Sequence, residues 1–176
     1  MMKAIGSRKR SARKPDGSYQ TFLGLVDDLL QSEPVQRLDT FTHHADSSRL
    51  QHSVNVAYYS FLLCRRLGLD AASAARAGLL HDLFFYDLAN KKDGPHHTYL
   101  HPAIALQNAE ELTDLCDIER DIILCHMWPR AHFPRYFESF IVSFMDKAAF
   151  FTEISRTVFI HHKSPKRAQA PVSVKL

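Results

Sequence analysis

The stretch GLLHDLFFYD, residues 78–87, places a histidine and an aspartate side by side inside an apolar run. Its leucines and phenylalanines favour burial in a protein core. If His81 and Asp82 follow their neighbours into the core they lose hydration, and a buried carboxylate without a partner is costly. The doublet therefore indicates a site at which another group stabilises buried polar side chains, and a divalent metal ion is one such group.

Several predicted helices carry one polar residue on an apolar face. Apolar positions three and four apart predict helices over about 21–31, 49–67, 71–83, 102–112, 114–126 and 136–161. In the last helix the inward stripe runs through Val142, Asp146 and Ala149. A lone histidine on such a face is usually a hydrogen-bonded core residue, but several polar residues aimed at one centre need a common partner. The set comprises His52, His81, His126 and Asp146, with His101 at the start of a fifth helix.

These helices define the fold class, because no segment alternates as a strand does. We predict an all-α bundle of about six to seven helices that occupies residues 19–162. No apolar run approaches the roughly 20 residues of a membrane helix. No apolar segment of the signal-peptide kind follows the basic N-terminus, so we expect no membrane partner.

Composition and charge agree with a soluble domain. The 176 residues are 45% hydrophobic and 23% charged. The three cysteines, Cys64, Cys116 and Cys125, form no CxxC pair, which favours the reducing cytoplasm over a disulfide framework. Ten of the 22 basic residues lie in 1–14 and 163–176, where there is no acidic residue. Residues 15–162 therefore carry 12 basic against 19 acidic residues and are acidic overall. We interpret residues 1–18 as a flexible basic arm and 163–176 as a basic tail. Neither interleaves aromatic with basic residues, so nucleic acid is not the expected partner.

The donor types restrict the metal. Imidazole and carboxylate ligands suit Fe, Mn, Co, Ni or Zn better than Ca or Mg alone. Neighbouring residues on a helix point about 100° apart, so His81 and Asp82 reach one ion only if the helix ends or bends there. Alternatively they serve two ions, with the carboxylate between them.

The ordered pattern of His52, then His81-Asp82, then Asp146 resembles the HD-domain superfamily of metal-dependent phosphohydrolases. RLQHSVNVAYYSFLL (49–63) is similar to the first motif of that superfamily, and ARAGLLHDL (75–83) to its doublet motif. The resemblance covers about residues 45–155. The segments CHMWP and SFMDKAAF are further similar to a bacterial subgroup of hydrolase-like HD proteins.

The resemblance implies a binuclear metal centre. Its core site would be held by His52, His81, Asp82 and Asp146, with Asp82 as the bridge. His101, in the His-Pro pair, and His126, in IILCHMWP (122–129), match the two extra histidines of members that hold two metals. His96 and His97 compete with His101 for this role. We assign the role to His101, because the proline after it starts a helix in the superfamily manner.

The function implied is hydrolysis of a small phosphorylated molecule. A metal-activated hydroxide would attack a phosphomonoester or phosphodiester, a nucleotide being one example. The catalytic residues we expect are Asp82, as the metal bridge, together with Arg49 and Lys147. Arg49, one helical turn before His52, and Lys147, next to Asp146, would contact the phosphate. Phe84 and Phe85 follow the doublet where HD-GYP phosphodiesterases carry a lysine, which argues against cyclic di-GMP as the substrate.

Two other functions share these ligands. The first is a di-iron HD-fold oxygenase, which a mixed-valence iron signal and oxygen consumption would favour. The second is a regulatory module that binds a metal or nucleotide without turnover, which a negative phosphatase screen would favour.

Overall fold

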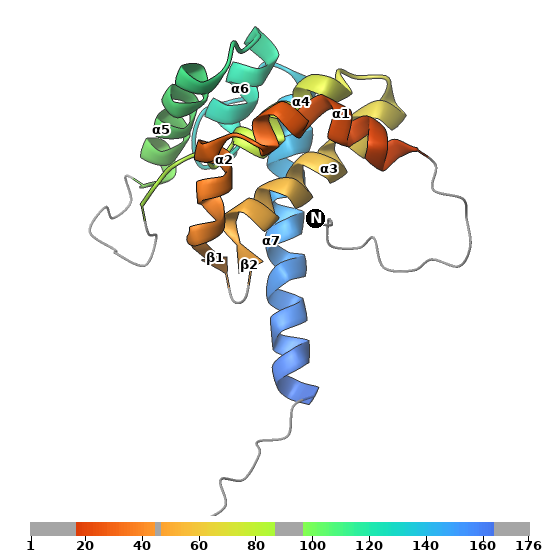
Figure 1. The fold of residues 1–176 in the computed structure, drawn as a ribbon, viewed down its shortest axis with the longest axis vertical. Helices are drawn as coiled ribbons and strands as arrows, with labels where there is room; N and C mark the ends of the chain where they lie inside the picture. Colours follow the sequence, from red (N-terminus) through yellow and green to blue (C-terminus); the bar gives the residue numbers. More distant parts are fainter. Residues whose placement is uncertain (1–16, 45–46, 87–96, 164–176) are drawn as a thin grey trace, which may run out of the picture.

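The computed structural model describes residues 17–44, 47–86 and 97–163, and within them the protein is all-α, as predicted (Figure 1). Seven α-helices, one 3₁₀ helix and a short strand pair make up the described chain. In chain order they are α1 (Ser18–Leu30), α2 (Glu33–Arg37), η1 (Leu38–Thr40), β1 (Thr42–His44), β2 (Ser47–Ser48), α3 (Arg49–Leu67), α4 (Ala71–Leu80), α5 (His97–Leu112), α6 (Asp117–Cys125) and α7 (Phe137–Lys163).

Capping residues define the central helix pair, α3 and α4. The Ser48 hydroxyl accepts a hydrogen bond of 3.2 Å from the backbone N–H of Gln51 and so begins α3. Gly68 ends α3 in the left-handed conformation, at a φ of 72°. The Asp70 carboxylate then begins α4 by accepting backbone N–H bonds within its first turn. The sequence prediction of a helix over 49–67 is therefore confirmed.

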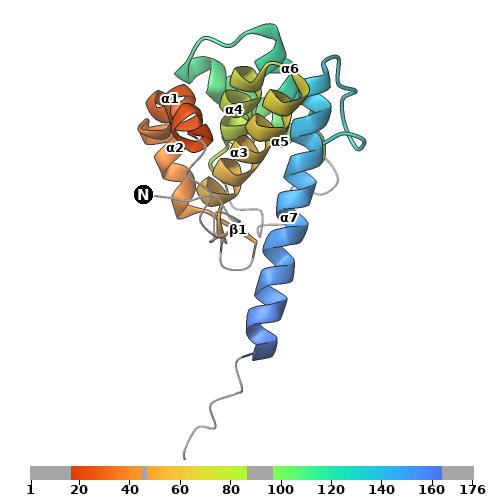
Figure 2. The same cartoon turned by 90° about the vertical axis from the view of Figure 1, so that its right-hand side faces the viewer.

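The core lies between α3, α4 and the helices around them. Gly78 of α4 lets the pair approach closely, since a Cβ at that position would lie 2.9 Å from the Cα of Ala57. α1 packs on α4 and α3, whereas α6 and α7 pack on the other flank, with α5 against α6. α7 contacts α3, α4 and α6 and then continues past the body of the molecule (Figures 1 and 2). None of the described helices has the length and apolar character needed to span a lipid bilayer.

Two helix boundaries next to candidate ligands differ from the prediction. α4 ends at Leu80 rather than near residue 83, because His81 and Asp82 form a turn in which the Leu83 N–H bonds the Leu80 carbonyl at 3.0 Å. α5 begins at His97, so Pro102 lies inside the helix rather than in its first turn. Proline has no N–H to donate, so α5 forgoes one backbone hydrogen bond there.

The short elements before α3 were not predicted. α2, η1 and the antiparallel β1–β2 pair span two to five residues each, too few for periodicity to reveal them. They bring Ser47 next to α7, where its hydroxyl donates to a Glu153 carboxylate oxygen at 3.3 Å. Apart from residues 17, 18 and 163, the predicted basic arm and tail lie outside the described residues.

Candidate metal centre

Two helices end at histidines that are held in the same way. His81 follows α4 and His126 follows α6, and each ring bonds through Nδ1 to the backbone carbonyl three residues earlier, Gly78 or Ile123, at 2.8 Å. A carbonyl only accepts, so Nδ1 must carry the hydrogen in both rings. Each ring therefore turns Nε2 towards the interior, as a metal-ligating histidine with a fixed tautomer does.

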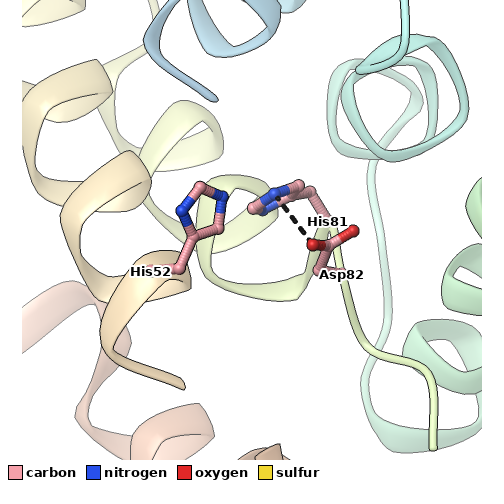
Figure 3. Close-up of side chains that lie close together, drawn as sticks. All are labelled: His52, His81 and Asp82. Atoms are coloured by element: carbon pink, nitrogen blue, oxygen red, sulfur yellow. Dashed lines mark ion pairs between the residues drawn. The ribbon is translucent and has the colours of Figure 1, made fainter. Parts of the chain in front are cut away.

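The first group of candidate ligands joins α3, the end of α4 and α7. His52 and His81 lie with ring centroids 5.6 Å apart, and Asp82 lies beside His81 (Figure 3). The Asp146 Oδ1 lies 3.0 Å from Nε2 of His52 and 3.8 Å from Nε2 of His81. Nε2 of His81 is buried and has no hydrogen-bond partner among the described residues.

The second group of candidate ligands joins α5 and the end of α6 to Asp82. The Nε2 atoms of His101 and His126 face each other at 2.8 Å, and each lies 3.6 Å from Oδ1 of Asp82. The other oxygen, Oδ2, lies 3.7 Å from Nε2 of His81. The two carboxylate oxygens of Asp82 thus face the two groups separately. In each trio, His52–His81–Asp82 and Asp82–His101–His126, the ligand atoms lie within 4.8 Å of one another.

Burial makes the electrostatics of the centre strong. Burial disfavours charge on His52, but its bonds to Asp146 and Glu153 outweigh this and raise its pKa to about 10. Burial, together with the neighbouring His81 and His101 rings, lowers the pKa of His126 to about 3, so this ring stays neutral. Its Nε2 therefore offers a lone pair.

The pKa values of Asp146 and His81 are shifted by their contacts with each other and with neighbouring ligands. Although burial opposes ionisation of Asp146, the His52 and His81 rings hold its pKa well below the ordinary value. Burial also opposes charge on His81, yet Asp82 and Asp146 raise the pKa of that ring. The centre thus combines carboxylate oxygens with imidazole nitrogens at close range, a donor set that fits a divalent transition metal. As a ligand, His52 would release its proton when the cation binds.

The sequence analysis missed Glu153, a buried carboxylate of α7. Its Oε2 lies 3.2 Å from Nδ1 of His52, and its Oε1 accepts from the Asn55 side chain at 3.0 Å. Glu153 thus holds the ring nitrogen of His52 that points away from Asp146. The signal was present, because the inward stripe of Val142, Asp146 and Ala149 reaches residue 153 at its next step of four.

Arg49 lies in a different setting from the one predicted. Its guanidinium is fully buried, lies 3.7 Å from the centroid of the Phe84 ring, and donates to the carbonyls of Phe84 at 2.6 Å and Tyr86 at 3.1 Å. It therefore fixes the segment that directly follows the His81-Asp82 doublet. Contact with a phosphate, as predicted from the sequence, would require these bonds to break.

Lys147 lies at the border of the centre and is 39% exposed. Its Nζ donates to the His126 carbonyl at 3.1 Å and to Ser143, and it lies 3.8 Å from Oδ2 of Asp146. Partial burial lowers its pKa. His96 and the side chain of His97, the alternatives to His101, lie outside the described part of the chain.

Comparison with known proteins identifies relatives of part of the chain. A family model described as HD domain matches residues 49–149, more than half of the chain. Ribonuclease Y of Clostridium tetani is 33% identical over 85 residues, which cover 47% of this chain and 16% of that protein. Ribonuclease Y of Thermus thermophilus is 56% identical over 34 residues, 19% of this chain and 6% of that protein. The chain thus spans only a small part of these relatives. No solved structure matches it.

Proposed function

Because the chain belongs to the HD-domain superfamily of metal-dependent phosphohydrolases, we propose that it hydrolyses a phosphomonoester or phosphodiester, with nucleotides as the first class to test. The observation that carries this proposal is Asp82, whose two carboxylate oxygens face two separate groups of histidines. A carboxylate in this position can bridge two cations a few ångströms apart.

The proposed roles follow from the two groups. His52, His81, Asp82 and Asp146 would hold one divalent cation, and Asp82, His101 and His126 would hold a second. When bound, such cations activate water for attack on phosphorus and neutralise charge on the phosphate oxygens. Glu153 and the Gly78 and Ile123 carbonyls orient the ligating rings.

The two cationic side chains take different roles in this proposal. Arg49 is a positioning residue, because its bonds to Phe84 and Tyr86 hold the turn that carries Asp82. Lys147 remains the candidate for phosphate contact, since its ammonium group is partly exposed next to Asp146. Positive charge beside the cations would stabilise the transferring phosphoryl group.

The relatives guide the choice of substrates. Their name, ribonuclease Y, describes proteins that cleave RNA, so a short RNA belongs beside nucleotides in the screen. The screen combines a phosphomonoester, a phosphodiester, cyclic nucleotides and RNA with Mn²⁺, Co²⁺ or Ni²⁺. Turnover that needs an added or retained cation is the expected result. Oxygen consumption by an iron-loaded protein without phosphate release would favour the oxygenase instead.

Metal analysis of the purified chain tests the ligand set directly. We expect about two metal equivalents for the wild type, and about one fewer for His126→Ala while the protein stays folded. His132→Ala is the matched control, because His132 is an exposed histidine in the loop that follows α6. Equal metal content in His126→Ala and His132→Ala would remove His126 from the centre.

A further inference from the structure

The outer face of α7 carries exposed phenylalanines at a regular spacing. Phe137, Phe144 and Phe151 are 75%, 64% and 69% exposed, and they are seven residues apart. Seven residues take an α-helix through nearly two turns, so these rings lie along one side. Phe133, 73% exposed in the preceding loop, joins them through the Phe140 ring at a centroid distance of 5.6 Å. We call Phe133, Phe137, Phe144 and Phe151 the phenylalanine stripe.

Between Phe137 and Phe151 the outer face of α7 is largely apolar, with the 39% exposed Lys147 at its border, three residues after Phe144 and four before Phe151. Glu138 is buried, Asp146 contacts His52, and Lys147 bonds backbone carbonyls. A row of large exposed apolar side chains along one side of a helix marks an interaction surface. In Figure 2, α7 lies at the edge of the molecule with the other helices on one side of it, so the described helices leave the outer side uncovered.

We propose that a second copy of this chain covers the phenylalanine stripe, with the two α7 helices packed against each other about a two-fold axis. The first argument is area. At about 200 Å² for each phenylalanine, the exposed parts of the four rings offer roughly 550 Å² per copy. A pair would thus bury about 1,100 Å² from these rings alone, close to the lower limit of about 1,200 Å² for a stable interface.

The second argument is shape. Beside the stripe a groove of about 290 Å³ runs between α3 and α7, and its lining includes Tyr59 on one side and Met145, Ala148 and Thr152 on the other. A protruding row of rings next to a largely apolar groove is a self-complementary surface, as an interface with two-fold symmetry requires. Rings of one copy would enter the groove of the other.

Charge favours this occupant over other partners. Binding of a surface helix to an anionic membrane uses basic residues on the polar face. Between Phe137 and Glu153 the one basic residue of α7 is Lys147, whose ammonium group bonds the carbonyls of His126 and Ser143. A charged protein partner would find only the Lys147 ammonium group beside the stripe between Phe137 and Phe151, and that group already bonds the His126 and Ser143 carbonyls. A second uncharged row of aromatic rings does match it.

The test is the mass of the full chain in solution, measured by light scattering or sedimentation over a range of micromolar concentrations. We expect the mass of two chains for the wild type. Phe144→Glu and Phe151→Glu should each raise the dissociation constant by about 30-fold or more. Leu67→Glu, at an exposed leucine of α3 (58% exposed), is the control and should leave the mass unchanged.

Circular dichroism and unfolding curves establish that each variant is folded. If a glutamate variant does not fold, serine at the same position adds no charge and must give the same dissociation. A wild type that stays a single chain at every concentration overturns the proposal. So does a dimer that survives both phenylalanine substitutions. A single chain that binds vesicles containing phosphatidylserine would assign the stripe to a membrane instead.

Discussion

Glu153 is the residue of α7 that holds the Nδ1 atom of His52. The carboxylate contacts Nδ1 of His52 and the amide of Asn55, and it is almost completely buried. When a ring is held at one nitrogen, the other nitrogen keeps a fixed direction, and loss of such a partner typically weakens metal binding. Glu153 therefore acts on the candidate centre through His52.

We predict that Glu153→Gln lowers the metal affinity of the chain by about tenfold or more while the helical content is kept. The amide retains the size of the side chain but removes the charge that stabilises the imidazole. Calorimetric titration with Mn²⁺ or Co²⁺ measures the change. Glu111→Gln, at an exposed position of α5, serves as the control. Equal affinities for the two variants would limit Glu153 to a packing role.

At this scale the sequence predicts which residues lie near the centre better than it predicts their contacts. Helical periodicity places His52, His126 and Asp146 on inward faces, and the structure brings them together with Asp82. Periodicity says nothing about hydrogen bonds, so the buried position of Arg49 among aromatic rings could not be foreseen. The backbone carbonyls that orient His81 and His126 arise only after the helices have formed.

Among the helices, the close packing of α3 on α4 depends on one glycine. Gly78 has no side chain at the point where its Cβ would lie 2.9 Å from the Cα of Ala57 and 3.3 Å from its backbone nitrogen. These atoms belong to a helix backbone and cannot move alone. The backbone carbonyl of Gly78 also accepts the hydrogen bond that orients the His81 ring. Gly78 therefore affects both the packing of the two helices and the orientation of a candidate ligand.

We predict that Gly78→Ala destabilises the protein by about 1–3 kcal/mol, because the added methyl group forces the two helices apart. Gly24→Ala is a matched control in α1, where nothing lies within 4 Å of the added Cβ. That change should stabilise the protein by about 0.5–1 kcal/mol, since alanine favours the helix interior. Urea unfolding measures both. A neutral Gly78→Ala would show that the helix pair can separate at little cost.

Element boundaries were predictable where a capping residue marks them. Ser48, Gly68 and Asp70 begin or end helices at the expected positions. The end of α4 was set too late, because the apolar run continues through Leu83 although the chain has already turned. The start of α5 was set too late because proline usually stands in the first turn of a helix, whereas Pro102 lies further inside this one.

For the whole molecule, the candidate centre ties together parts of the chain that are far apart in sequence. Its members come from α3, the ends of α4 and α6, α5, and α7. A cation that binds only the folded arrangement stabilises it, by about 2.7 kcal/mol at a hundredfold excess over its dissociation constant. Metal binding should therefore be visible in global stability and not only in turnover.

We predict that treatment with a chelator lowers the melting temperature by about 5–10 °C, and that Mn²⁺ or Co²⁺ restores it. The cation stabilises the native state alone, so its removal shifts the unfolding equilibrium. Differential scanning calorimetry gives the change. His126→Ala should respond less than His132→Ala, which keeps every candidate ligand. An unchanged melting temperature for the wild type would mean that the helices are held together without help from an ion.

α7 points Asp146 and Glu153 inward and Phe144 and Phe151 outward, and both pairs have the same interval. Each added residue rotates an α-helix by about 100°. One amino acid inserted or deleted between positions 147 and 150 would therefore rotate Phe151 and Glu153 by about 100° relative to Phe144 and Asp146, so that neither pair would share a face of the helix. A side-chain replacement, by contrast, alters one position and leaves the other three in place. In this helix a change in chain length is a far harsher alteration than a change in residue identity.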